Sequence, residues 1–189
     1  PVDFSAPIMN SVQGKLTNNP LVSISWSAVR NAQAYEVFVA RDSNFSQIVF
    51  IHTTTSTSIT PPTPLADGGY YVRVRAYNPD LNPGKFSKAI NFAVDATPPV
   101  APNLLSPASG ATTTKRAWLK WSVVNSVVKY QIQVDNNSDF SSPEFDATTS
   151  KATIQTKSLP ARTYYWRVRG IDSAGNWSAW SQTFLFTTK

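Results

Sequence analysis

The chain has 189 residues and a net charge of +6, with 14 Pro, 7 Gly and no Cys. The missing Cys excludes disulfides, thiolate metal sites and cysteine nucleophiles, and no apolar run approaches the roughly 20 residues that span a bilayer. The composition is rich in Thr, Ser, Val and Tyr, and no segment has the spacing of a long amphipathic helix, so we expect an all-β fold.

The first half of the chain alternates apolar and polar residues with the period of two that half-buried strands require. Residues 22–26 alternate Val, Ile and Trp with Ser, and residues 35–39 place Tyr and two Val on one face. The uncharged segment 47–51, Gln-Ile-Val-Phe-Ile, follows, and residues 70–77 alternate again, with Arg73 on the outward face. This pattern predicts short strands separated by turns.

The second half of the chain repeats this pattern about 95 residues later, which indicates two copies of one domain. The matched residues are Trp26 with Trp121, Tyr35 with Tyr130, Phe45 with Phe140, and 70–75 with 164–169 after a one-residue slip. We therefore expect domains over residues 1–96 and 97–189, each of about seven strands. The joint, residues 95–102, contains three Pro and should be short and stiff, because proline fixes φ and extends the residue before it.

The positive charge is unevenly shared between the two copies. Residues 1–96 hold seven basic and six acidic side chains, and residues 97–189 hold ten basic and five acidic ones. The basic residues are scattered singly along the expected strands, which favours a solvated surface over a nucleic-acid site. The chain opens at Pro1 with no initiator Met and no charged-then-apolar leader, so we expect a processed product or a piece of a longer protein.

Together these motifs resemble fibronectin type III domains over the whole chain. The resemblance rests on a Trp in the second strand, a Tyr opening the third, a Leu five residues before a later Tyr, the Arg-Val-Arg stretch, a Thr-Pro-Pro linker and an Ala-Gly-Asn-Trp-Ser ending. It implies an all-β fold of two tandem seven-stranded antiparallel Greek-key β-sandwiches of the fibronectin type III or immunoglobulin-like kind. It also implies a tyrosine corner in each copy, at Tyr70 and Tyr164, whose hydroxyl bonds nearby backbone. The core residues that it implies are Trp26, Trp121, Tyr35, Tyr130, Tyr70 and Tyr164.

The segment 177–181, Trp-Ser-Ala-Trp-Ser, is similar to the Trp-Ser-x-Trp-Ser box of cytokine-receptor fibronectin domains. In that box, outward Arg side chains interleave with the Trp rings by cation–π attraction. We favour a ladder that clamps an edge of the sandwich, and the alternative is an exposed platform for a glycan or a partner. The first copy has Pro-Gly-Lys-Phe-Ser at residues 83–87, which favours the structural role. The side chains concerned are Arg167, Arg169, Trp177, Trp180 and Tyr165.

No group of residues in the sequence predicts an active site. Residues 41–44 and 135–139 resemble half of a calcium loop but lack the Gly and the bidentate Glu of an EF-hand, so we expect capped turns anchored by buried rings. His52 is the single histidine and has no clustered carboxylate or Cys beside it in the sequence. No serine elbow, acid pair or phosphate loop is found. We expect no enzyme activity, no catalytic residue, no cofactor and no metal.

Our leading functional hypothesis is a non-enzymatic, extracellular structural or adhesive module, secreted or on the cell surface. Its stiff tandem sandwiches would mediate protein–protein contacts in a surface protein or in a self-assembling filament, with residues 47–51 as the edge that pairs. The expected partners are proteins, copies of the chain included, and glycans, with no nucleic acid and no membrane insertion.

Two alternatives stay open. The first is a spacer or carbohydrate-binding accessory of a secreted polysaccharide-degrading enzyme, which would bind glycan through Trp118, Trp177 or Trp180. The second is a receptor ectodomain, which is weakened by the missing disulfides that receptor domains with this box usually carry.

Overall fold

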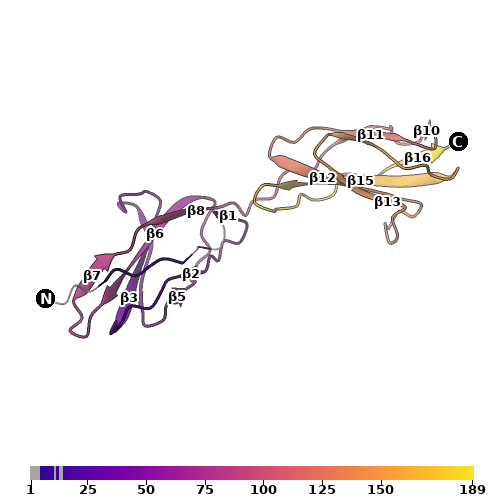
Figure 1. Cartoon of the computed structure of the whole chain (residues 1–189). Coiled ribbons are helices and arrows are strands. Elements are labelled where there is room, and N and C mark those ends of the chain that lie inside the picture. Colours follow the sequence, from indigo (N-terminus) through magenta and orange to yellow (C-terminus); the bar gives the residue numbers. More distant parts are fainter. Residues whose placement is uncertain (1–4, 11, 13–14) are drawn as a thin grey trace. The chain divides into compact units, whose positions relative to one another are not determined.

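The structure is a computed structural model that describes residues 5–10, 12 and 15–189; Pro1, at which the chain opens, lies outside this part. The chain divides into two compact units, Pro1–Thr97 and Pro98–Lys189, each built from β-strands (Figure 1). Within the described residues there is no helix, and therefore none that is long and apolar enough to cross a membrane.

The first unit is a sandwich of one larger and one smaller sheet. The larger sheet has the order β1-β8-β6-β3-β4, with β7 pairing with β6, and the smaller sheet pairs β2 with β5. Its strands are β1 (Leu16–Thr17), β2 (Ile24–Ser25), β3 (Ala34–Ala40), β4 (Ile48–Thr54), β5 (Ser58–Ile59), β6 (Gly68–Tyr77), β7 (Pro83–Phe86) and β8 (Ile90–Val94).

The second unit repeats the arrangement with more regular strands. One sheet has the order β10-β16-β15-β12-β13, and the other has the order β14-β11-β9. Its strands are β9 (Leu104–Ser106), β10 (Ala111–Thr113), β11 (Trp118–Trp121), β12 (Val127–Asp135), β13 (Phe145–Thr149), β14 (Thr153–Gln155), β15 (Thr163–Asp172) and β16 (Phe184–Thr188).

The leading strand of each unit is divided between the two sheets. In the second unit β9 pairs antiparallel with β11, whereas β10 pairs parallel with β16 in the opposite sheet. In the first unit Met9 bridges Trp26, and β1 pairs parallel with β8. The expected seven strands count this leading segment once. In the second unit the structure divides it into β9 and β10, whereas in the first unit the eighth strand arises because β7 and β8 both pair with β6.

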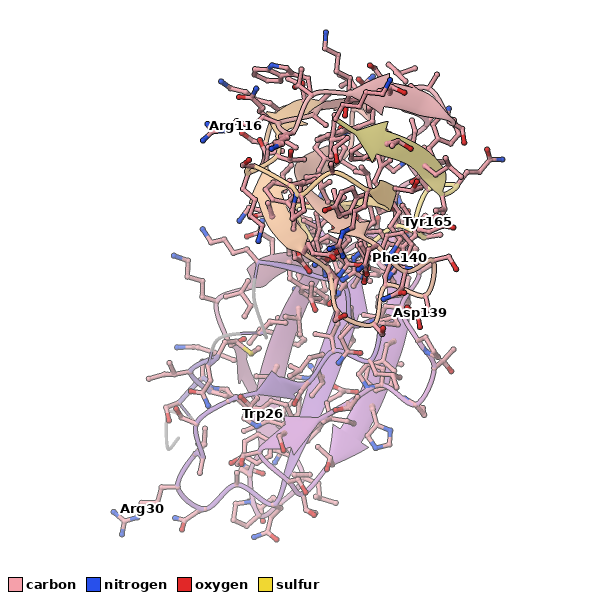
Figure 2. The ribbon with its side chains drawn as sticks, turned by 90° about the vertical axis from the view of Figure 1, so that its right-hand side faces the viewer. Trp26, Arg30, Arg116, Asp139, Phe140 and Tyr165 are labelled. Atoms are coloured by element: carbon pink, nitrogen blue, oxygen red, sulfur yellow. The ribbon has the colours of Figure 1, made fainter. Side chains whose placement is uncertain are left out.

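Each unit has its own core, formed where the inward rows of the two sheets meet. Trp26 and Tyr35 are buried with ring centroids 5.5 Å apart, and Trp121 and Tyr130 repeat the contact at 5.4 Å (Figure 2 labels Trp26). Tilted aromatic pairs at this separation add to the free energy gained from burial. The Tyr130 hydroxyl accepts a hydrogen bond from the Val124 backbone N–H, so burying the phenol leaves its oxygen satisfied.

A buried tyrosine near the start of a long strand is held the same way in both units. The Tyr70 hydroxyl donates to the Ala66 carbonyl at 2.5 Å, and the Tyr164 hydroxyl donates to the Pro160 carbonyl at 3.1 Å. Burial raises the pKa of both phenols. Each hydroxyl therefore ties the loop before the strand to the strand itself.

Replacing Tyr164 by phenylalanine should destabilise the second unit by about 1 kcal/mol, because the variant keeps the buried ring but removes a partly buried hydrogen bond. Denaturant unfolding measures the change. Tyr165→Phe removes a hydroxyl from the next, partly exposed position and should change stability by less than about 0.5 kcal/mol. Equal losses in the two variants would contradict this account.

The start of the predicted joint is anchored within the first unit. The Ala96 backbone N–H and the Thr97 hydroxyl both donate to the Asp67 carboxylate. The hydrogen bond from Ala96 is the main reason that the pKa of Asp67 lies below its ordinary value. Residues 96 and 97 thus have fixed positions in this unit.

Candidate binding surfaces

Five side chains on the outer face of the second unit stack into one ladder. The Arg167 guanidinium lies 4.0 Å from the centre of the Phe140 ring and 4.3 Å from Trp180. The Arg169 guanidinium lies 4.5 Å from Trp180 and 4.3 Å from Trp177. The order is therefore ring, cation, ring, cation, ring, with cation–π attraction at each contact.

The strand register gives each of these cations a hydrogen-bonding partner. Arg167 lies opposite Gln133 and Arg169 opposite Gln131, because β15 pairs with β12. The Gln133 side-chain oxygen accepts from Arg167 and the Gln131 oxygen accepts from Arg169, while both Gln amides donate to Asp146. Burial and then the neighbouring Arg169 lower the pKa of Arg167. Each guanidinium is thus held to the neighbouring strand by at least one hydrogen bond.

The serines of the Trp-Ser-Ala-Trp-Ser segment continue the pairing of β15. Ser178 Oγ accepts from the Gly170 backbone N–H and Ser181 Oγ accepts from the Val168 N–H, and both hydroxyls are buried. The segment therefore acts as an irregular edge strand whose side chains satisfy backbone donors. This geometry favours a clamp over an open platform.

The structure brings together four of the five residues predicted for this ladder and adds Phe140. Tyr165 lies in the same outward row of β15, opposite Asp135, but makes no ring contact with the ladder in the described part of the chain. We predicted Phe140 as the buried anchor of a turn, and it also ends the ladder. The signal in the sequence was the match between Phe140 and Phe45. In the structure, Phe45 lies under Arg73 as Phe140 lies under Arg167.

The first unit has a smaller version of the ladder. The Arg73 guanidinium lies 4.0 Å from the Phe45 ring and 3.9 Å from Phe86, and Arg75 forms an ion pair with Glu36 at 2.6 Å. Phe38 takes the position that Gln133 has in the second unit. Arg73 is therefore packed mainly against rings. Its pKa is lowered mainly by burial and, to a smaller extent, by the positive charge of Arg75.

The edge strands of the two larger sheets differ in charge. β4 ends its sheet, no strand in the described residues pairs with its outer side, and Ile51 is 51% exposed. The register places Ile51 opposite Phe38, as it places Asp146 opposite Gln133 in β13. β13 thus carries an acidic residue where β4 carries an isoleucine. Charges at sheet edges discourage pairing with other chains, so β4 has less of this protection.

Comparison with known structures identifies the fold. The FN1–FN3 domains of chicken CNTN1 match with a TM-score of 0.59 and 18% identity, over 98% of this chain and 69% of that one. The fibronectin(III)-like modules of Clostridium thermocellum CbhA match with a TM-score of 0.56 and 14% identity, over 97% of this chain and 94% of that one. Both units have the fibronectin type III fold. This result confirms the predicted all-β sandwich class.

A family model agrees with this assignment in the second fibronectin type III domain. Residues 111–189 match the model described as the Rha78A-like, N-terminal immunoglobulin domain. The comparison with curated proteins found no match. Modules with this fold generally serve as interaction or accessory domains and not as catalytic ones, and no catalytic family is indicated.

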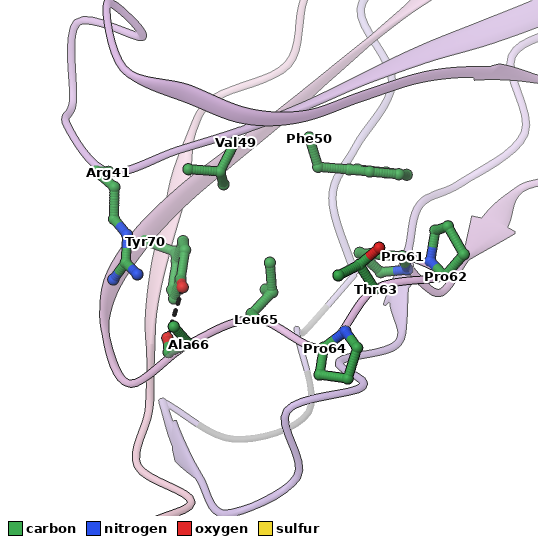
Figure 3. Close-up of a pocket in the computed structure, with 10 residues that line it drawn as sticks. All are labelled: Arg41, Val49, Phe50, Pro61, Pro62, Thr63, Pro64, Leu65, Ala66 and Tyr70. Atoms are coloured by element: carbon green, nitrogen blue, oxygen red, sulfur yellow. Dashed lines mark hydrogen bonds between the residues drawn. The ribbon is translucent and has the colours of Figure 1, made fainter.

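The first fibronectin type III domain has a shallow groove of about 270 Å³ between β4 and a proline-rich loop (Figure 3). Val49 and Phe50 line one side, and residues 61–66 line the other. At one end the Arg41 guanidinium lies 4.1 Å from the Tyr70 ring and donates to the Asp67 carbonyl. The groove is mainly apolar, and the residues that line it include no His, Asp, Glu, Cys or Lys.

The acidic loops are hydrogen-bonded turns. Asp172 Oδ1 accepts from the backbone N–H groups of Ala174, Gly175 and Asn176, and Oδ2 accepts from the Asn176 side chain. Burial raises the pKa of Asp172, but these hydrogen bonds outweigh it, and the pKa lies below the ordinary value. Asp42 caps its own loop, with the Gln47 N–H as the strongest contribution to its lowered pKa.

Within the described residues, no three His, Cys, Asp or Glu side chains gather as a metal site would require. His52 lies on β4, exposed, with its ring stacked on Phe50 at 6.0 Å. The ring is thus placed at the open sheet edge and not in a polar pocket.

Proposed function

We propose that this chain is a non-enzymatic structural or adhesive module of an extracellular protein, and that β4 pairs with the β4 of a second copy. The observation that carries the proposal is the edge itself, which has no Asp, Glu, Lys or Arg side chain and exposes Ile48, Val49 and Ile51. An edge strand offers a row of unpaired N–H and C=O groups to a partner chain.

Two copies of one edge can pair antiparallel about a twofold axis, because such an interface uses the same surface on both partners. The backbone supplies hydrogen bonds, and the exposed Val and Ile side chains supply apolar area. The acidic Asp146 on the corresponding strand β13 disfavours the same contact in the second domain, since two copies would bring like charges together.

Light scattering across a concentration series tests this proposal. The wild-type chain should rise above its monomer mass of 20.8 kDa with concentration, and Ile51→Asp should stay monomeric, because it places on β4 the charge that β13 already has. Thr148→Asp adds the same charge to β13 and should behave as wild type. A wild-type chain that stays monomeric at high concentration contradicts the proposal.

A second candidate function is an accessory domain of a secreted polysaccharide-degrading enzyme, which the exposed indole of Trp118 favours. Trp118 is 55% exposed, whereas Trp177 is 36% exposed and its ring, like that of Trp180, is stacked against Arg169. Of the three Trp residues considered for glycan binding, Trp118 is therefore the one with the most open ring.

A further inference from the structure

One face of the second domain gathers basic side chains around Trp118. On β11 the inward residues Leu119 and Trp121 are buried, as is Ala117 just before the strand, so Trp118 and Lys120 point outward, and both are exposed. Arg116, two residues before Trp118, is also exposed. At about 3.3 Å per residue, Trp118 and Lys120 lie roughly 7 Å apart along the strand, and Arg116 lies just before the strand begins.

The neighbouring strand β14 adds a second outward row. The register places Gln155 beside Trp118 and Thr153 beside Lys120. Beyond the strand end, the Thr156 N–H donates to the Ala117 carbonyl and the Leu159 N–H donates to the Lys115 carbonyl, so the two segments continue side by side. Lys157 therefore lies next to Arg116, and both side chains are exposed.

No acidic residue belongs to this side of the domain. Residues 103–134 and 147–171 contain no Asp or Glu, and these ranges include all of β9, β11 and β14. The acids of the second domain lie on β12, β13, the loop between them and the end of β15: Asp135, Asp139, Glu144, Asp146 and Asp172. In Figure 2 Arg116 lies on one side of this domain, and Asp139 and Phe140 lie on the other.

The first domain provides an internal comparison for the same face. The pair Ile24 and Ile59 in the first domain corresponds to the pair Leu119 and Ile154 in the second. With this alignment, the first domain has Leu21, Ser23 and Ser25 where the second has Arg116, Trp118 and Lys120. It has Thr60 and Pro62 where the second domain has Gln155 and Lys157. The fold therefore does not require a charge or an aromatic ring at these positions.

We propose that this surface, formed by Arg116, Trp118, Lys120, Gln155 and Lys157 and called here the basic Trp face, binds an acidic polysaccharide. The exposed indole offers a flat apolar surface for one sugar ring, and Gln155 offers an amide for a hydroxyl. Arg116, Lys120 and Lys157 lie near the indole in sequence or strand register and offer positive charge to the carboxylates of a polymer. The absence of acids on this side makes its charge complementary to a polyanion.

Two other polyanions fit the face less well. Single-stranded nucleic acids stack successive bases on several aromatic side chains, whereas this face has one. Anionic membranes are bound by a broad apolar face that enters the bilayer interface together with basic side chains, whereas these three strands expose two large apolar side chains, Trp118 and Leu105. This proposal rests on the second candidate function, the accessory domain of a polysaccharide-degrading enzyme, and names the class of ligand that such a domain would bind. It does not depend on pairing through the β4 edge.

The test is binding of the full chain to polygalacturonate at low salt, measured by affinity electrophoresis and calorimetry. Trp118→Ala should weaken binding about tenfold through loss of ring stacking. The triple variant R116Q/K120Q/K157Q should lose measurable binding. The matched control R30Q/K88Q/K129Q removes the same net charge from exposed positions elsewhere and should bind as wild type. Polygalacturonate with methyl-esterified carboxylates keeps the rings but not the charge and should not bind.

Several outcomes would overturn the proposal: no wild-type binding, equal losses in the two triple variants, an unaltered affinity of Trp118→Ala, or tighter binding of an oligothymidylate or of phosphatidylserine vesicles. Circular dichroism of each variant shows whether the sandwich is intact, which we expect because all substituted side chains are exposed. Ile51→Asp should bind polygalacturonate like wild type, so this test and the test of self-association fail independently.

Discussion

Replacing Trp121 by alanine should destabilise the second domain by about 3–5 kcal/mol, because the indole is 2% exposed and the truncation leaves a cavity between the two sheets. A domain of this size has a total stability of only about 5–15 kcal/mol, so the variant approaches the unfolded state. Denaturant unfolding followed by tryptophan fluorescence should show an early transition for the second domain and an unchanged one for the first.

The matched control lies three residues away on the same strand. Trp118→Ala removes the same side chain from a position that is 55% exposed, and the stability should change by no more than about 0.5 kcal/mol. Similar losses in the two variants would mean that the inward and outward rows of β11 are wrongly placed.

The second large effect is expected at Asp172. Asp172→Ala leaves three backbone N–H groups and the Asn176 amide without their acceptor, and should cost about 2 kcal/mol. The folded pKa of Asp172 is depressed, so its stabilising contribution is fully present above the unfolded pKa and is lost as the pH falls through the folded pKa.

Measuring unfolding free energy against pH separates this charge from the shape of the loop. The difference between wild type and Asp172→Asn should be constant near neutral pH and should shrink as the medium becomes more acidic than the ordinary aspartate pKa. Asp80→Asn changes an exposed carboxylate in another loop and serves as the control. A difference for Asp172→Asn that does not vary with pH would contradict the account of this turn.

The sequence predicts the core better than the surfaces, for a physical reason. Burial follows from residue type and the period of two, so Trp26, Trp121 and their tyrosine partners could be recognised from one strand at a time. The ladder was also predictable, because Arg167 and Arg169 alternate outward on a single strand. Phe140 was placed only as a turn anchor, since a residue with φ of 55° redirects the chain in a way that periodicity does not describe.

The basic Trp face was missed because it depends on the register between strands. Along the chain, Arg116, Lys120 and Lys157 are separate charges, and we interpreted them as a scattered, solvated set. The pairing of β11 with β14 brings Lys157 next to Arg116. Four strands, β11 to β14, and the loops between them separate Arg116 from Lys157 in sequence, and spacing alone does not predict which cross-strand neighbours meet.

The parallel pairing of β10 with β16 has a mechanical consequence. Ala111, Thr112 and Thr113 lie beside Phe186, Thr187 and Thr188 with both strands running in the same direction. Tension on the chain before β10 and after β16 loads the two strands in shear. Their hydrogen bonds are therefore strained at the same time and do not break one after another. The shorter pairing of β1 with β8, two residues on each strand, resists such pulling less, so under force the first domain should yield before the second.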